Sequence, residues 1–314
     1  MRLYRYISGR GGFQPRLAVA AGNGPPVDLL DAWQELTGTS LGWDETGFLV
    51  SFMSLIEDGP LLWGEISDVC AAASTQEHLV VDQATNNFRP LCPFDRLASL
   101  KDFLTFEDHV KLGAERRDTD VSPYWYEAPI YYKGNHRALI GPEDVCRWPR
   151  YAARLDFELE LGMVIGRRGR GIRPSAAHDY IFGFTIFNDF SARDVQAKEM
   201  NAWLGPARGK DFCNAFGPCI VTADEVGAEP DLEMICRVNG EEWGRARSSQ
   251  MHWRWADLIA HVSECEDVYP GDLFGSGTPG GCCGLDLGRE LHSGDVVELE
   301  IEKIGVLRNY IGAP

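Results

Sequence analysis

Beyond residue 95, apolar residues alternate with polar ones or form short continuous runs, a pattern that is typical of β-strands. The pattern predicts strands over 130–132, 155–165, 180–187, 233–238 and 296–304. Helical spacing is restricted to 191–203, 254–264 and a segment that begins at Ser99, where Ser99-x-x-Asp102 predicts a capping box and a helix through Leu112. Asn239-Gly240 lies between two strand-like runs and predicts a tight hairpin.

The first 95 residues have a more mixed pattern. Short strands are predicted over 3–7 and 16–20, around a glycine-rich turn at 9–12, and helices over 28–36, 48–56 and 66–73. Asp28 is the expected N-cap of the first helix. Pro90 and Pro93 punctuate a loop. We therefore expect an α+β chain that is mostly β, with a smaller N-terminal α/β domain at 1–95 and a larger domain at 96–314.

The charge balance argues against polyanionic partners. The 314 residues include 30 Lys and Arg against 47 Asp and Glu, a net charge of −17. Such an acidic chain has no bulk attraction for phosphate backbones or anionic membranes, so we expect neither nucleic acid nor a membrane as partner. The N-terminus has no apolar signal-peptide core, and no apolar run approaches the roughly 18 residues of a membrane span.

The cysteines indicate the compartment. There are nine, an odd number, scattered and without a C-x-x-C motif, which is typical of reduced thiols in the cytoplasm. The vicinal pair Cys282-Cys283 has no Cys or His at ligand spacing, so we interpret it as incidental rather than as a metal site.

Three acidic residues in Asp156-Phe-Glu-Leu-Glu160 carry the strongest chemical signal. In a strand, alternation would place Asp156, Glu158 and Glu160 on one face. The flanking apolar residues indicate a central strand, where neighbouring carboxylates repel one another and are costly to desolvate. Either this face lies in water, or a cation binds between Glu158 and Glu160.

Two further segments supply oxygen and nitrogen donors. Asp189 ends a nearly continuous apolar run, and either caps the following helix or completes a three-carboxylate set suited to Mg²⁺, Mn²⁺ or Ca²⁺. Asp102 and His109 are two turns apart on the predicted helix, so Asp102 could be another oxygen ligand and His109 a base. Alternatively, His109 is a structural or solvated histidine.

The glycine-rich loop at 275–281 could bind an anion. Its backbone N–H groups and the hydroxyls of Ser276 and Thr278 could hold a carboxylate or an oxyanion, although the same composition is typical of a plain turn. Lys210 is either a solvated loop lysine or an electrophilic group. The glycines at 166–171 do not fit a dinucleotide-binding motif and indicate a basic hairpin turn.

Taken together, these motifs resemble the fumarylacetoacetate hydrolase (FAH) superfamily over about residues 99–312. The resemblance rests on their order and spacing as much as on each motif. The matching pieces are Asp102 to His109, Asp156 to Leu161, Tyr180 to Asp194, Val238 to Glu241, Pro270 to Asp272 and Gly275 to Pro279.

The resemblance implies a C-terminal β-roll of mixed sheets around a metal site, usually in a homodimer. It implies four metal ligands, which are Asp102, Glu158, Glu160 and Asp189. It implies that the remaining site residues act on the substrate, with His109 as general base, Asp286 orienting it, Lys210 stabilising charge, and Arg193, Gln196 and Thr278 contacting substrate. A divalent cation is therefore expected, with Mg²⁺ as first choice and Mn²⁺ or Ca²⁺ as alternatives.

One difference from the family concerns the base. The family usually has Glu where this chain has Asp286, so we expect the shorter side chain to hold His109 loosely or through a water molecule. The arginine that the family places soon after the histidine is either Arg116 or Arg117.

The function implied by the resemblance is metal-dependent hydrolysis of a C–C bond in a 1,3-dicarbonyl acid, such as an acylpyruvate or a fumarylacetoacetate-like keto acid. The alternative is a decarboxylase, isomerase or hydratase of the same family that acts through an enolate. A third hypothesis is a non-catalytic, metal-stabilised scaffold, against which the retained His109, Asp286 and Lys210 argue.

Overall fold

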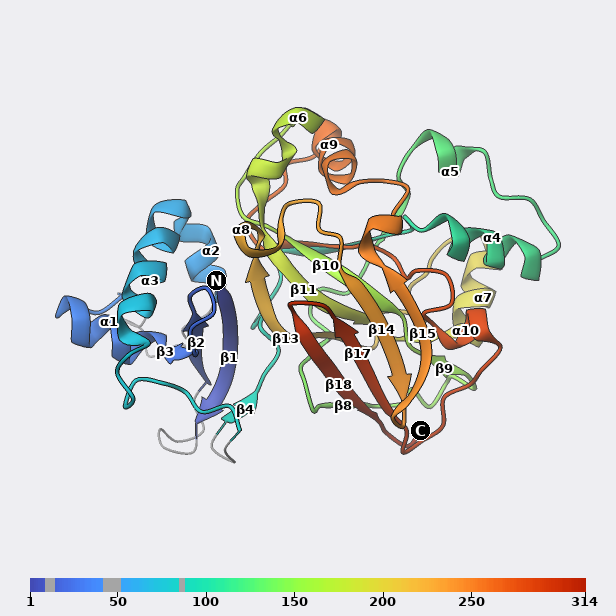
Figure 1. The fold of residues 1–314 in the computed structure, drawn as a ribbon. Helices are drawn as coiled ribbons and strands as arrows, with labels where there is room; N and C mark the ends of the chain where they lie inside the picture. Colours follow the sequence, from blue (N-terminus) through green and yellow to red (C-terminus); the bar gives the residue numbers. More distant parts are fainter. Residues whose placement is uncertain (9–14, 42–51, 85–87) are drawn as a thin grey trace.

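The protein's structure is a computed structural model that describes residues 1–8, 15–41, 52–84 and 88–314. These residues form three sheets with short helices around them, so the predicted α+β fold that is mostly β is confirmed (Figure 1). Within the described residues, the largest sheet has eleven strands and the second has five.

Neighbouring strands in the sheets are often distant from one another in the sequence. The main path of the eleven-stranded sheet is β3 (Val27–Asp28), β2 (Pro15–Ala20), β1 (Arg2–Ser8), β13 (Asn214–Thr222), β11 (Ile181–Asp189), β10 (Leu159–Ile165), β16 (Asp272–Gly275), β5 (Ser99–Phe103) and β6 (Tyr131–Lys133). Two strands lie off this path, β4 (Phe88–Pro90) beside β1 and β7 (Leu139–Ile140) beside β13. The five-stranded sheet runs β15 (Glu241–Arg247), β14 (Glu233–Val238), β17 (Val296–Ile301), β18 (Gly305–Ile311) and β8 (Val145–Cys146), and a third sheet pairs β12 (Ser191–Ala192) with β9 (Leu155–Asp156).

The helices are short and lie around the sheets. They are α1 (Leu29–Thr37), α2 (Phe52–Asp58), α3 (Pro60–Ala73), α4 (Glu107–Arg116), α5 (Tyr124–Glu127), α6 (Pro174–Ala177), α7 (Arg193–Asn201), α8 (Ala223–Val226), α9 (Trp255–Cys265) and α10 (Gly284–Leu287). Two 3₁₀ turns, η1 (His178–Tyr180) and η2 (Ser248–Gln250), complete the elements. Figure 1 shows α1–α3 gathered at the N-terminal end of the molecule and α4, α7 and α10 near one another at the opposite end.

Apolar side chains cover both faces of the large sheet, which explains the continuous apolar runs in its central strands. On β10, Leu161, Met163 and Ile165 point into a core shared with the five-stranded sheet. The alternate residue Val164 points into a second core shared with α1–α3. Because both faces are buried, charged residues on β10 and β11 occur only near the strand ends, as Glu160 and Asp189.

The N-terminal strands continue the same sheet as the rest of the chain. Leu3 of β1 pairs with Ile220 of β13, and the terminal ammonium of Met1 lies 2.7 Å from a Glu225 carboxylate oxygen. Backbone hydrogen bonds therefore cross the boundary predicted at residue 95, and the division into domains at 1–95 and 96–314 stays a prediction.

Several local predictions are confirmed. Asp28 caps α1 by accepting a hydrogen bond from the Asp31 N–H. The segment 233–238 is β14, and the hairpin after it turns through Asn239 and Gly240 with φ of 52° and 78°. Two positive φ values are what a two-residue hairpin with a type I′ turn requires. The glycine-rich turn at 9–12 and the start of the helix predicted at 48–56 lie outside the described residues.

The helix predicted from Ser99 is wrong. Ser99–Phe103 is strand β5, which pairs in parallel with β16, and the helix begins only at Glu107. The Ser99 hydroxyl donates to Asp272 Oδ1 at 2.6 Å across the sheet instead of capping a helix. Pairing with a strand far along the chain overrides the local capping signal.

The strand predicted at 155–165 is interrupted. β9 ends at Asp156 and β10 begins at Leu159, so Phe157 and Glu158 lie outside the ladder of the large sheet. An oxygen of the Asp156 carboxylate accepts from the Phe157 N–H at 2.9 Å, and the Glu158 N–H donates to Asn188 Oδ1 at 3.2 Å. These polar contacts satisfy the backbone at the break.

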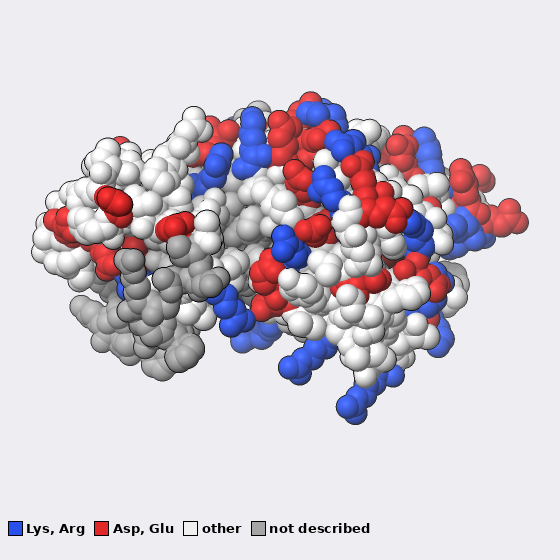
Figure 2. Space-filling model, turned by 60° about the horizontal axis from the view of Figure 1, so that its bottom comes forward, with Lys and Arg blue, Asp and Glu red and all other residues white. Residues whose placement is uncertain are grey.

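The surface carries both signs of charge. Figure 2 shows acidic and basic side chains interspersed over much of the face in view, so the negative net charge is not gathered there in one acidic patch. Every helix within the described ranges is too short or too polar to cross a bilayer.

The close approach of β11 to β13 generates a stability prediction. A Cβ on Gly183 would lie 2.3 Å from the Val221 carbonyl oxygen and 2.9 Å from Thr222 Cα, both backbone atoms of β13. A Cβ on Gly162, in the adjacent strand, would lie 3.4 Å from the nearest atom, Thr185 Cγ2. We expect Gly183→Ala to lower the free energy of unfolding by roughly 2–3 kcal/mol and Gly162→Ala by less than about 1 kcal/mol. Urea denaturation measures both, and equal losses would contradict the packing described.

Candidate active site

Four adjacent strands of the large sheet place one row of residues on the same face. In the order β11, β10, β16 and β5, the row is Asp189, Glu160, Gly275 and Asp102. The registers agree with this alignment, because Gly275 pairs with Asp102 on one side and with Gly162, two residues from Glu160, on the other. The three acidic side chains of this row are buried.

The three carboxylates of this row form a candidate cation site, called here the carboxylate cluster. One oxygen of each of Asp102, Glu160 and Asp189 lies within 4.8 Å of the others. Asp102 Oδ1, Glu160 Oε1 and Asp189 Oδ1 are buried and have no hydrogen-bond partner. Unpaired buried oxygens are costly unless a cation binds them, and oxygen-only donors suit a hard divalent ion.

Gly275 makes room between these carboxylates. A Cβ at this position would lie 2.3 Å from Asp102 Oδ1 and 2.7 Å from Glu160 Oε2. The space beside the oxygens therefore admits no side chain. The residues present fit a small, oxygen-preferring cation.

Burial and mutual repulsion raise the pKa values of the three carboxyl groups in the cluster. Burial is the largest cause that raises the pKa of Asp102 above its usual value. Burial, followed by the charges of Asp102 and Asp189, raises the pKa of Glu160 well above the usual range. The pKa of Asp189 is also raised by burial, even though the Lys210 charge opposes this. A divalent cation would offset both the cost of burying these carboxylates in ionised form and their mutual repulsion.

Other groups hold the second oxygens of the cluster in place. The Gly277 N–H donates to Glu160 Oε2 at 3.0 Å, and the Tyr132 hydroxyl donates to Asp189 Oδ2 at 2.8 Å. Tyr132 pairs with Asp102 across β5 and β6, which places it on the same face. Burial and the nearby Asp189 charge raise the pKa of Tyr132 well above its usual value, so the phenol keeps its proton.

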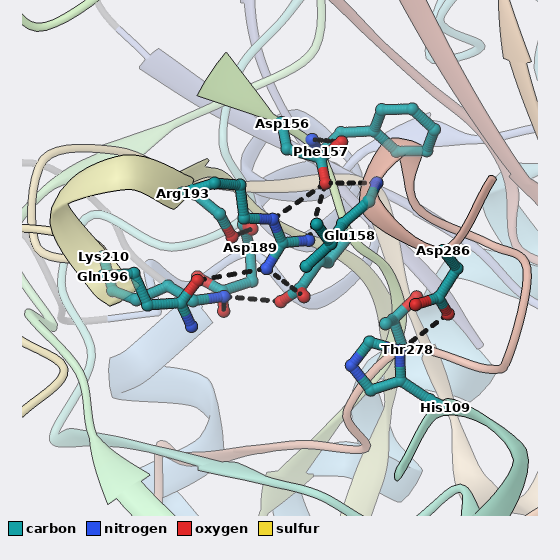
Figure 3. Close-up of polar contacts among 12 residues, drawn as sticks. His109, Asp156, Phe157, Glu158, Asp189, Arg193, Gln196, Lys210, Thr278 and Asp286 are labelled. Atoms are coloured by element: carbon teal, nitrogen blue, oxygen red, sulfur yellow. Dashed lines mark hydrogen bonds and ion pairs between the residues drawn. The ribbon is translucent and has the colours of Figure 1, made fainter. Parts of the chain in front are cut away.

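Two buried cations lie beside the carboxylate cluster. The Lys210 ammonium contacts both Glu158 and Asp189, and Arg193 Nη1 lies 2.8 Å from Glu158 Oε1 (Figure 3). Burial alone would raise the pKa of Glu158, but the charges of Arg193 and Lys210 lower it below its usual range. Burial alone would lower the pKa of Lys210, whereas the Asp189 and Glu158 charges raise it above its usual value.

Asp156 fixes the backbone around the buried ion pairs of Arg193 and Lys210. Its carboxylate accepts from Arg193 Nε at 2.8 Å and from the N–H groups of Gly284 and Leu285 at 2.8 and 2.9 Å. One buried carboxylate thus joins α7, which begins at Arg193, to the start of α10. Asp286 follows one residue after Leu285, so the same contacts position the next group.

His109 and Asp286 form a partly buried pair at the edge of the site. His109 Nδ1 lies 2.7 Å from Asp286 Oδ2, and Arg116 Nη1 donates to Asp286 Oδ1 at 2.8 Å. Burial of the Asp286 carboxyl would raise its pKa, but the hydrogen bond with His109 and the charge of His109 lower it below its usual value. An ionised carboxylate only accepts, so in the neutral form of the ring Nδ1 carries the proton and Nε2 carries the lone pair.

The predicted site residues are distributed as follows. The structure brings together Asp102, Glu160 and Asp189, whereas Glu158 contacts Lys210 and Arg193. Asp102 and His109 do not share a helix, because Asp102 is on β5 and His109 on α4. The expectation of a loose or water-mediated contact between Asp286 and His109 is also wrong, since α10 brings the shorter side chain directly to the ring.

Gln196 and Thr278 make contacts within the protein. Gln196 Oε1 accepts from Arg193 Nη1 at 3.2 Å, and the Thr278 hydroxyl donates to the Cys282 carbonyl at 3.2 Å. Figure 3 shows Gln196 beside Arg193 and Lys210, and Thr278 near His109 and Asp286. Their contacts with substrate stay predictions.

The sequence does not identify Tyr132 and Gly275 as neighbours of the carboxylate cluster. It predicts Tyr132 only as part of a strand and Gly275 only as part of an anion-binding loop. Alternation along 130–132 could have indicated that Tyr132 shares a face with Asp102, but only once the pairing of β5 with β6 was known.

This combination of a carboxylate cluster, buried cations and a His–Asp pair is typical of enzymes that use a hard divalent cation. The family model described as fumarylacetoacetate (FAA) hydrolase C-terminal matches residues 99–312. The chain belongs to this family, and the resemblance inferred from the motifs is confirmed.

Relatives and solved structures agree with this assignment. The chain is 30% identical to mitochondrial oxaloacetate tautomerase FAHD2A of Bos taurus over 302 residues, 95% of this chain and 87% of that protein. It is 36% identical to mitochondrial oxaloacetate tautomerase Fahd2a of Rattus norvegicus over 187 residues, which cover 58% of each protein. The structure of a fumarylacetoacetate hydrolase from Exiguobacterium antarcticum superposes with a TM-score of 0.73 at 25% identity, over 100% of both chains.

The first prediction at this site concerns the cation. We expect Mg²⁺ or Mn²⁺ to raise the melting temperature of the chelator-treated protein, and Glu160→Gln to abolish most of that rise. Gln keeps the volume but removes one charge that attracts the ion, and it also relieves repulsion in the cation-free state. Glu264→Gln, at an exposed position on α9, is the matched control and should keep the full rise. A wild-type melting temperature that no divalent cation changes would contradict a site here.

The second prediction concerns pH. A carboxyl whose folded pKa is raised contributes stability below its unfolded pKa of about 4, and this contribution is lost as pH rises through the folded pKa. The cation-free protein should therefore lose the contribution of Glu160 and Asp189 toward neutral pH, whereas a cation binds their ionised forms. Thermal unfolding with and without Mn²⁺ should show a larger cation-induced rise near neutral pH than at about pH 5. A larger rise at the lower pH would contradict the assignment.

Proposed function

We propose that this protein is a divalent-cation-dependent enzyme that interconverts the keto and enol forms of a small 2-keto dicarboxylic acid such as oxaloacetate. The observation that carries the proposal is the His109–Asp286 pair beside the carboxylate cluster. The likeness to oxaloacetate tautomerase over 95% of this chain supports the choice of substrate. Mg²⁺ is the proposed cation, and the enzyme is proposed to act as a homodimer in the cytoplasm.

The proton chemistry follows from the tautomer of His109. Asp286 accepts from Nδ1, so Nε2 is free to take a proton from the carbon next to the keto group and return it to the oxygen. The reverse transfer regenerates the keto form; only C–H and O–H bonds are made or broken, while the double bond moves between C=O and C=C. Arg116 and the Gly281 N–H, at 2.8 and 3.1 Å from the Asp286 carboxylate, keep that carboxylate oriented through the cycle.

The charge of the enolate needs stabilisation. A cation held by Asp102, Glu160 and Asp189, with Glu158 as the proposed fourth ligand, would supply Lewis-acid polarisation of the keto-acid oxygens. Lys210 adds a buried positive charge beside the same carboxylates, and Arg193 and Gln196 lie next to it (Figure 3). We propose that these three residues bind the substrate's carboxylates and developing negative charge, and that Thr278 contacts the substrate from the loop at 275–281.

A second candidate is hydrolysis of a C–C bond in an acylpyruvate or another 1,3-dicarbonyl acid. The end-to-end likeness to a fumarylacetoacetate hydrolase structure favours it. In this reaction His109 would take a proton from water, the hydroxide would add to the carbonyl carbon, and the C–C bond would break to leave an enolate. Decarboxylation, isomerisation and hydration by family members would share that enolate.

The test compares both reactions in one set of variants. Enol decay measures tautomerisation of oxaloacetate, and pyruvate release measures hydrolysis of acylpyruvates. We expect His109→Asn and Asp286→Asn to lower kcat of the true reaction by about 10²–10⁴-fold, the range for removing a general base or its orienting partner. Asp108→Asn and His292→Asn, both at exposed positions, are the matched controls and should keep kcat near the wild-type value.

The outcomes separate the candidates. Acceleration of enol decay that depends on His109, without pyruvate release, supports tautomerisation. Pyruvate release from acylpyruvates that depends on His109 supports hydrolysis instead. Full activity of His109→Asn in both assays would contradict the role assigned to the His–Asp pair.

A further inference from the structure

A second set of metal-binding donors lies beside the carboxylate cluster, and one of its members has no part in the proposed reaction. One donor atom from each of His109, Cys283 and Asp286 lies within 4.8 Å of the others. They come from α4, from the residue before α10 and from α10 itself. We call this set the His–Cys–Asp cluster.

The Cys283 thiol is the unexplained member. The residue is fully buried, and among the described residues its sulfur has no hydrogen-bond partner. The adjacent Cys282, by contrast, packs within the apolar core shared by the two large sheets. A buried thiol that faces a histidine and a carboxylate is positioned as a ligand rather than as core packing.

The two clusters differ in the ions that they suit. Asp102, Glu160 and Asp189 offer only oxygen, which hard cations prefer. The His–Cys–Asp cluster offers nitrogen, sulfur and oxygen, the donor set of Zn²⁺ and similar borderline or soft ions. Mg²⁺ has little affinity for thiolate, so it would not compete at the second cluster.

The geometry needs only small movements of the side chains, with His109 and Asp286 moving slightly apart from their present 2.7 Å. Zinc bonds of about 2.0–2.3 Å in a tetrahedron separate the donor atoms by roughly 3.3–3.8 Å, against the present limit of 4.8 Å. The backbone that carries the ligands is already fixed, because Cys283 forms a β-bridge with Glu158 and Asp156 binds the N–H groups of Gly284 and Leu285. His109, whose side chain is 13% exposed, leaves a route for the ion and a place for water as fourth ligand.

We infer that His109, Cys283 and Asp286 form a site for Zn²⁺ that inhibits the enzyme. On binding, the Cys283 thiol releases its proton to solvent and the His109 ring shifts its proton from Nδ1 to Nε2, while new S–Zn, N–Zn and O–Zn bonds hold the thiolate, the imidazole and the Asp286 carboxylate. The ion would capture the histidine that acts as base and replace its hydrogen bond with Asp286. The inhibition rests on the proposed function of His109, whereas the binding does not.

Cobalt makes the site visible without an activity assay. The protein is stripped with chelator, saturated with Mg²⁺ and titrated with Co²⁺, which takes zinc sites and gives a thiolate-to-cobalt charge-transfer band. We expect one equivalent to produce this band and the intense visible bands of a tetrahedral ion, and Zn²⁺ but not excess Mg²⁺ to remove them. Cys283→Ser should lose the charge-transfer band. Cys282→Ser, the buried neighbour, and Glu160→Gln, in the carboxylate cluster, should keep it.

Activity supplies an independent readout. With saturating Mg²⁺, Zn²⁺ should inhibit the wild type, and Cys283→Ser should need at least about tenfold more Zn²⁺ for half-inhibition. Because a cysteine variant could fail to fold, His109→Asn is titrated with Co²⁺ as well, and its visible spectrum should lose the tetrahedral bands.

The outcomes are distinct. No charge-transfer band at one equivalent of Co²⁺, or a band that persists in folded Cys283→Ser, would overturn the zinc site. A band that depends on Cys283 supports the site even if neither keto-acid reaction is found. A band without inhibition of a demonstrated reaction supports binding but contradicts inhibition through His109.

Discussion

The structure depends on an imbalance of buried charge. Five carboxylates, those of Asp102, Asp156, Glu158, Glu160 and Asp189, are buried together, and among the described residues Arg193 and Lys210 are the two cations that contact them. Asp156 and Glu158 are paired with these cations, whereas Asp102 and Glu160 lie next to each other and contact no cationic side chain of the described residues. A protein interior tolerates such a group only if protons or a further cation compensate for it. The raised pKa values of Glu160 and Asp189 and the unpaired oxygens both follow from this imbalance.

The large sheet makes this arrangement possible. Its two faces pack against separate apolar cores, so the central strands carry charged residues only near their ends, where they leave that cover. At the point where they do, β11, β10 and β5 each supply one carboxylate, and Gly275 on β16 leaves the space between them open. Because the backbone hydrogen bonds of four strands fix the row, the carboxylates cannot move apart to relieve their repulsion. Rigid placement of like charges is what creates affinity for a cation.

The sequence predicted the parts of this arrangement that depend on local pattern. Alternation located β14, the Asn239-Gly240 turn identified the hairpin, and an apolar run ending in Asp189 identified a carboxylate at the end of a buried strand. The wrong helix at Ser99 and the undivided strand at 155–165 have a common cause, since contacts with segments distant in the chain decide both. The contact between His109 and Asp286 joins residues 177 positions apart. The family resemblance implied that contact, but no spacing rule could have derived it.

The same long-range contacts connect the two donor clusters. Asp156 binds Arg193 on one side and the N–H groups at the start of α10 on the other, while Glu158 bridges to Cys283. The segment that carries the buried carboxylates is therefore also the support for Cys283 and Asp286. A displacement of this segment would alter both the carboxylate cluster and the orientation of His109. The cation site and the base consequently depend on one piece of backbone, which explains why a carboxylate as costly to bury as Asp156 is held by both side-chain and backbone donors.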